Sequence, residues 1–136
     1  MAESSTGALK ERPLSPHLSI YKPIPTMVMS ILHRITGVAL YGGTLLLAWW
    51  LIATESGPQA YNTFAAVAGS PIGIIILIGF TWALIHHMLG GLRHFLWDTG
   101  RGLEKATATR LAILTIVLSL ALTAILWAGY FLLGGM

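Results

Sequence analysis

The 136-residue chain has no cysteine and few charged residues. Without cysteine it forms no disulfide and offers no thiolate to a metal or an iron–sulfur cluster, so histidine is its only good ligand for a transition metal. Charged residues make up 10% of the sequence and hydrophobic residues 55%. A chain this short cannot hide so much apolar surface in a soluble core, and the composition therefore predicts a membrane protein with the lipid bilayer as its solvent.

The eight lysines and arginines bracket the apolar runs instead of forming a basic stripe. This placement predicts no nucleic-acid partner. All eight fall before or within the start of the first apolar run, or around the connection after the second. The positive-inside rule then predicts a cytoplasmic N terminus and a periplasmic C terminus. Residues 1–11 resemble neither a secretory signal nor a transit peptide, which favours the bacterial inner membrane as the location.

Three apolar runs predict an all-α protein with transmembrane helices at about residues 26–54, 71–98 and 108–133. We expect residues 1–25 to form an N-terminal surface segment and residues 26–136 to form the membrane anchor domain. The many prolines before residue 26 favour an extended segment along the membrane surface. Residues 55–64 combine turn formers with two aromatics, and we expect a loop there.

Histidines cluster at the end of the second predicted helix, which is otherwise apolar. His87, Gly91 and His94 share one helix face by their i, i+4 and i+7 spacing. An imidazole facing a bundle interior suits an axial haem ligand, and a glycine one turn away leaves room for a flat macrocycle. His94 and Arg93, nearer the surface, are candidates to bind the haem propionates. We expect His86, on another face, to have a structural role.

A second polar cluster lies at the start of the first predicted helix. Ser30, His33, Arg34 and Gly37 share a face, and the predicted topology brings them to the same membrane surface as His94. A hydroxyl beside a cation suits the carbonyl oxygen of a quinone and would stabilise negative charge that develops on reduction.

The residues of both clusters are also compatible with roles that need no cofactor. A histidine inside a membrane can simply bond a neighbouring helix, and an arginine near a helix end can extend towards water. A non-redox scaffold or a proton-relay subunit could also use the same histidines. A relay should continue into the outer half of the bundle. Going outward across the membrane from His86 and His87, the predicted helices carry no ionisable residue until Glu55, just past the far end of the first one.

Three motifs together resemble a known family. They are residues 12–21 (Arg-Pro-Leu-Ser-Pro-His-Leu-Ser-Ile-Tyr), residues 30–37 (Ser-Ile-Leu-His-Arg-Ile-Thr-Gly), and residues 87–94 (His-Met-Leu-Gly-Gly-Leu-Arg-His) with Trp97 and Asp98. In order and spacing they resemble the cytochrome b556 anchor subunits of succinate dehydrogenase, respiratory complex II. The resemblance implies three transmembrane helices, one haem b shared with a second membrane-anchor subunit, and a ubiquinone site near the cytoplasmic face. It also implies an iron–sulfur subunit and a flavoprotein subunit, which carry the iron–sulfur clusters and the flavin.

The same resemblance assigns individual residues. It makes His87 the axial ligand of the haem iron and places Ser30 and Arg34 in the quinone site. Around the haem propionates it places His33, Arg34 and His94, with Arg93 as a further candidate, and it gives Asp98 a supporting role. The implied function is a membrane anchor of succinate:ubiquinone oxidoreductase that is not catalytic in isolation. The anchor of a fumarate reductase, which runs the reverse reaction, is the alternative within this class.

Overall fold

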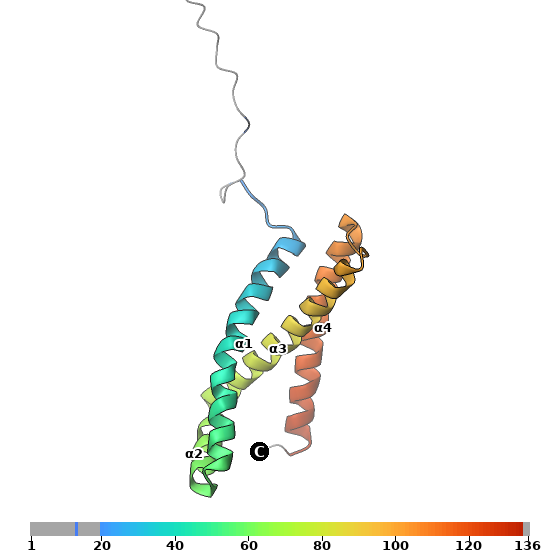
Figure 1. Cartoon of the computed structure of the whole chain (residues 1–136). Coiled ribbons are helices and arrows are strands. Elements are labelled where there is room, and N and C mark those ends of the chain that lie inside the picture. The colour runs from blue at the N-terminus through green and yellow to red at the C-terminus, as the bar shows by residue number, and fades with distance from the viewer. Residues whose placement is uncertain (1–12, 14–19, 135–136) are drawn as a thin grey trace, which may run out of the picture.

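The computed structural model describes residue 13 and residues 20–134 and consists of four helices (Figure 1). These are α1 (Pro25–Glu55), α2 (Pro58–Ala68), α3 (Pro71–Asp98) and α4 (Lys105–Leu132). Three of them, α1, α3 and α4, are long and apolar enough to cross a membrane. The predicted all-α fold with three spans is therefore confirmed. Most of the predicted surface segment, residues 1–12 and 14–19, lies outside the described part of the chain.

Proline and glycine set the helix ends close to the predicted positions. Pro25 and Pro71 occupy the first turns of α1 and α3, where a missing N–H leaves no bond unmade. Ser70 caps α3, since its Oγ accepts a hydrogen bond from the Gly73 N–H at 3.1 Å. After α3, Gly100 and Gly102 take positive φ angles of 74° each, which reverse the chain into α4. The helix α4 starts at Lys105, three residues before the predicted start at residue 108.

The expected loop over residues 55–64 is wrong, because α2 occupies most of it. Gly57, with a φ angle of 101°, makes the reversal after α1. Pro58 then opens a helix whose several alanines favour helical backbone over the loop expected from the turn formers of this stretch. Phe64 packs edge-on against Trp49 of α1, with ring centroids 5.0 Å apart. These packing contacts hold α2 beside the far end of α1.

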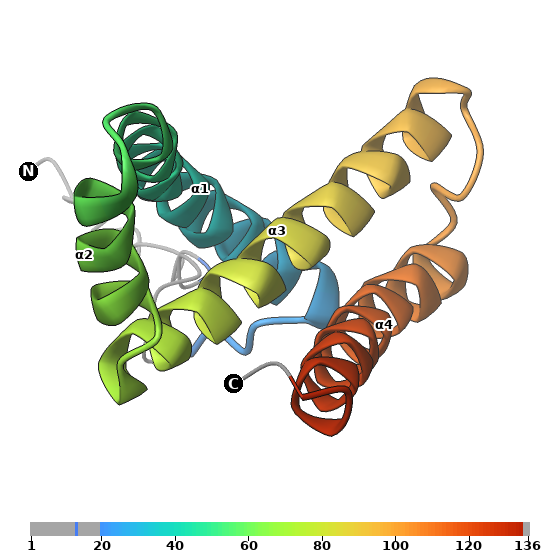
Figure 2. The same cartoon turned by 90° about the horizontal axis from the view of Figure 1, so that it is seen from below.

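The helix α3 crosses between α1 and α4 and contacts both (Figure 1, Figure 2). The start of α1 and the connection between α3 and α4 lie at one end of the molecule, and α2 lies at the other (Figure 1). The described lysines and arginines all belong to the first end. Cytoplasmic orientation of that end stays a prediction.

Large apolar side chains mostly point outward, and small or polar ones fill the interior. The buried apolar residues of the described part are Met29, Ala53, Ala83 and Ala112. Gly43 allows the closest approach, since a Cβ there would sit only 1.8 Å from Cε2 of Phe80 in α3. This distribution is typical of helices that pack in lipid, where small residues let backbones approach each other.

Candidate functional site

The two polar clusters meet where α1 crosses α3. The His33 ring of α1 stacks on the His87 ring of α3, with centroids 3.9 Å apart and an interplanar angle of 9°. The His94 ring lies 5.4 Å from the His33 ring, centroid to centroid. The prediction that these distant segments are neighbours is thus confirmed.

His87 forms hydrogen bonds that determine which of its nitrogens carries the proton. Its Nδ1 lies 3.2 Å from the backbone oxygen of His33 and 3.2 Å from Oγ1 of Thr36. Because a carbonyl oxygen can only accept, Nδ1 of His87 donates the proton in that bond. In the neutral ring, Nε2 then keeps its lone pair, which is the form that binds a metal or a haem iron. No hydrogen bond reaches Nε2 of His87 within the described part of the chain.

Thr36 supports this arrangement from α1 and is only 1% exposed. Its hydroxyl donates to the backbone oxygen of Leu32, at 2.9 Å, so its own lone pairs face the Nδ1 proton of His87. Thr36 was not among the residues predicted from the sequence. Its position three residues after His33, on the same helix face, is the signal that could have found it.

Two glycines make space for the stacked imidazoles. A Cβ at Gly90 would lie 2.5 Å from Nδ1 of His33, and one at Gly37 would lie 3.1 Å from Cε1 of His87. In contrast, a Cβ at Gly91 would meet nothing within 4 Å. The space beside Gly91, one helix turn from His87, is compatible with a flat group such as haem. Gly90, which had no predicted role, is where α1 approaches α3.

Other predicted site residues lie around the rim of this crossing. His94 is exposed, and its ring packs edge-on against Trp97 with centroids 5.1 Å apart. Ser30 and Arg34 are also exposed, whereas His33 of the same helix face is half-buried against α3. The predicted shared face therefore divides: His33 and Gly37 pack inward, and Ser30 and Arg34 stay available to a ligand or a partner chain. Asp98, the last residue of α3, is exposed.

His86 has a different environment from its neighbour in the sequence. It is fully buried, and its Nδ1 lies 3.1 Å from Oγ of Ser119 in α4. The same Oγ accepts a hydrogen bond from Nε1 of Trp82 at 3.2 Å and donates to the backbone oxygen of Ile116 at 2.9 Å. His86 thus joins α3 to α4, in line with the structural role expected for it.

Arg93 is buried as well, with 6% of its surface exposed. It lines the seam between α3 and α4, and its guanidinium carbon lies 4.8 Å from the Trp97 ring centroid. Its Nε and Nη1 have no hydrogen-bond partner among the described residues. About 120° of helix rotation separates Arg93 from His87. The structure does not place the two side chains together.

Comparison with known proteins shows the family of the chain. Residues 8–126 match the family of succinate dehydrogenase/fumarate reductase transmembrane subunits. The succinate dehydrogenase cytochrome b556 subunit of Paracoccus denitrificans is 41% identical over 128 residues, covering 86% of this chain and 96% of that protein. The subunit of the same name from Rickettsia typhi is 39% identical over 117 residues, covering 86% and 91% respectively.

A mitochondrial relative is more distant. The succinate dehydrogenase cytochrome b560 subunit of Mus musculus is 34% identical over 110 residues, covering 79% of this chain and 65% of that protein. The three spanning helices and the bacterial relatives fit a multi-pass protein of the bacterial inner membrane. The chain belongs to the succinate dehydrogenase/fumarate reductase transmembrane subunit family, and its relatives favour a membrane subunit of succinate dehydrogenase.

Proposed function

We propose that this chain anchors a succinate dehydrogenase in the membrane, binds haem b through His87, and contributes to a ubiquinone site. The observation that carries the haem assignment is the bond from Nδ1 of His87 to the His33 backbone oxygen. This bond fixes the orientation of the His87 ring and leaves Nε2 unprotonated, with a lone pair that can bind iron. The names of the relatives, cytochrome b556 subunits, support haem b as the bound group.

A bound haem b would supply a one-electron carrier inside the membrane. His87 would supply one ligand to the haem iron from this chain, and we propose that a second membrane-anchor subunit provides the other axial ligand. His33, His94 and Arg34 stand at the end of the bundle where the described cations gather, and we assign them to the propionates. Asp98, exposed at the rim, would assist by positioning groups or delivering protons.

We place the proposed quinone site on the exposed face of α1, near the start of this helix. Ser30 and Arg34 lie one turn apart and both are exposed, so a hydroxyl donor and a cation can approach the same carbonyl oxygen. Ubiquinone would bind between these residues and partner chains. An iron–sulfur subunit and a flavoprotein subunit, docked at that face, would deliver the electrons from succinate. The family also includes fumarate reductase, but the similarity to succinate dehydrogenase subunits favours succinate oxidation.

Replacing the axial ligand tests the haem assignment. In the whole complex, His87→Met should keep a haem whose midpoint potential is higher than that of the unaltered protein, because a thioether ligand raises the potential of haem iron. A redox titration followed by absorbance measures this potential. An unchanged potential in His87→Met would show that another residue binds the iron.

The quinone site is tested by succinate-driven ubiquinone reduction in membranes. Ser30→Ala and Arg34→Ala should each slow the reduction at least about ten-fold, the scale of one lost charge-assisted or oxyanion-type contact. Thr54→Ala, at the opposite end of α1, is the matched control and should leave the rate unchanged. Full activity in both Ser30→Ala and Arg34→Ala would place the quinone elsewhere.

A further inference from the structure

We propose that the seam between α3 and α4 binds an anionic phospholipid, with Arg93 contacting its phosphate. Two features of the seam carry this proposal. One is a buried cation without a counter-charge, and the other is an apolar cavity that this cation lines.

Arg93 lacks the anion that a buried guanidinium needs. Its exposed fraction is 6%, and Nε and Nη1 are enclosed without hydrogen bonds. Asp98 and Glu104, the nearest acids in the sequence, are both exposed, and neither pairs with Arg93 in the described part of the chain. Charged groups inside a membrane are costly unless they are paired or hydrogen-bonded. An anion from outside the chain would remove this cost.

The cavity beside Arg93 has the shape and chemistry for a lipid chain. It has a volume of about 200 Å³ and, apart from Arg93 and Thr115, only leucines line it. These are Leu89, Leu92, Leu96, Leu111, Leu114 and Leu118. Arg93 lies five residues before the end of α3, or about 7.5 Å along the helix axis. At that depth a long side chain can meet a phosphate while the leucines contact an acyl chain.

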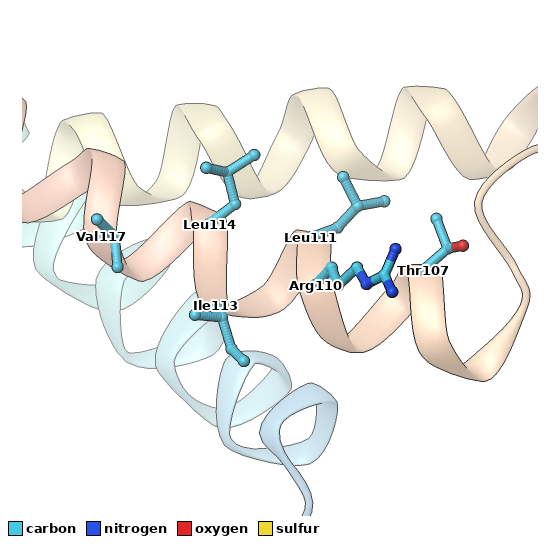
Figure 3. A pocket seen from close by; sticks show the side chains of 6 residues that line it. All are labelled: Thr107, Arg110, Leu111, Ile113, Leu114 and Val117. Carbon is cyan, nitrogen blue, oxygen red and sulfur yellow. The ribbon is translucent and has the colours of Figure 1, made fainter.

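A second groove continues this surface around α4. Its volume is about 420 Å³, and it shares Leu111 and Leu114 with the seam (Figure 3). Figure 3 shows Thr107 and Arg110 at the end of the groove nearest the start of α4, and Val117 at the other end. A phospholipid with two acyl chains could therefore lie on both sides of these two leucines.

The surrounding charges select an anionic lipid. Arg101, Lys105 and Arg110 are exposed around the connection and the start of α4, and no aspartate or glutamate lines either cavity within the described residues. Such a cluster attracts anionic headgroups more strongly than zwitterionic ones. A guanidinium also matches a phosphate with two parallel hydrogen bonds.

Native mass spectrometry of the purified whole complex tests the proposal. The delipidated complex is incubated with phosphatidylglycerol or phosphatidylcholine, and bound lipid is counted. The unaltered complex should retain phosphatidylglycerol in preference. Arg93→Gln should weaken this retention about ten-fold, the scale of one lost charge-assisted bond. Leu114→Trp should reduce it similarly by filling the groove. Lys22→Gln, an exposed cation before α1 and outside both cavities, is the control and should retain the lipid.

Four results would overturn the proposal. They are equal retention of the two lipids, unchanged retention in Arg93→Gln, displacement by inorganic phosphate alone, and occupation of the seam by a partner protein. Since the chain has no cysteine, Leu118→Cys introduces a single thiol there, and its crosslinking to a partner polypeptide would reveal the last case. If the Arg93→Gln complex fails to assemble, phosphatidylglycerol retention by the assembled Leu114→Trp complex tests the proposal, and unchanged retention there would overturn it.

Discussion

Two adjacent histidines of α3 show how the same side chain takes different roles on different helix faces. His86 is enclosed between helices, and the Ser119 hydroxyl that it contacts also bonds Trp82. His87 meets α1 through Nδ1 alone, because the His33 backbone oxygen and Thr36 occupy only that nitrogen. Nε2 of His86 also lacks a hydrogen-bond partner among the described residues, but it is buried, whereas His87 is only half-buried. The contrast shows that the neighbouring helix decides which imidazole leaves its free nitrogen accessible to a ligand.

The adjacent glycines Gly90 and Gly91 extend the comparison, and substitution at Gly90 is expected to have the largest effect. In Gly90→Val the new side chain would collide with His33, so α1 would be pushed from α3. Overpacking of this kind costs about 1–3 kcal/mol or more. We expect a lower melting temperature of the complex and loss of bound haem. At Gly91 a Cβ would meet nothing in this chain and would enter only the space proposed for haem. The matched control is therefore Gly79→Ala, also in α3, which should melt like the unaltered protein because a Cβ there would meet nothing within 4 Å.

Ser119→Ala removes the hydroxyl that His86 contacts where α3 packs against α4. Nε1 of Trp82 and the His86 ring would both lose their partner, which predicts a loss of about 1–3 kcal/mol in the free energy of unfolding. Thermal unfolding of the assembled complex measures the loss, and the haem absorbance should stay unchanged. The control Thr54→Ala removes a hydroxyl that bonds only its own helix. Loss of haem in Ser119→Ala would contradict the separation of the two faces.

Thr36→Val should have the smallest effect. The substitution keeps the side-chain volume and removes the hydroxyl near Nδ1 of His87, while the His33 backbone oxygen still holds the ring. Loss of one contact that orients a metal ligand lowers affinity by about ten-fold. We therefore expect haem to remain bound at saturation but to dissociate faster when apomyoglobin is added as an acceptor. An unchanged rate of haem dissociation would show that Thr36 does not help to orient His87.

Much of the fold could be predicted because hydropathy, proline and glycine are local signals. The three spans follow from uncharged runs of sufficient length, and Pro71 sets the start of α3. The helix α2 was missed because aromatic and amide residues obscured a short alanine-rich helix whose start depends on Gly57. A segment of this length gives little periodicity to read.

The site could be predicted only in part, since spacing gives directions on one helix but not the positions of its neighbours. The spacing of His87 and Gly91 indicated a common face, and His33 was expected nearby. The contact between Thr36 and His87 depends on the register of α1 against α3, which no sequence pattern specifies. The same limit applies to Arg93, whose burial follows from the approach of α4.

We propose that the His87 face of α3, and not the His86 face, holds the haem. The most direct test is the haem content of the purified complex, from the reduced-minus-oxidised spectrum, in His86→Ala and His87→Ala side by side. We predict that His87→Ala loses the haem b band, while His86→Ala keeps it and is only less stable. An unaltered haem b band in His87→Ala, or its loss in an assembled His86→Ala complex, would contradict the account.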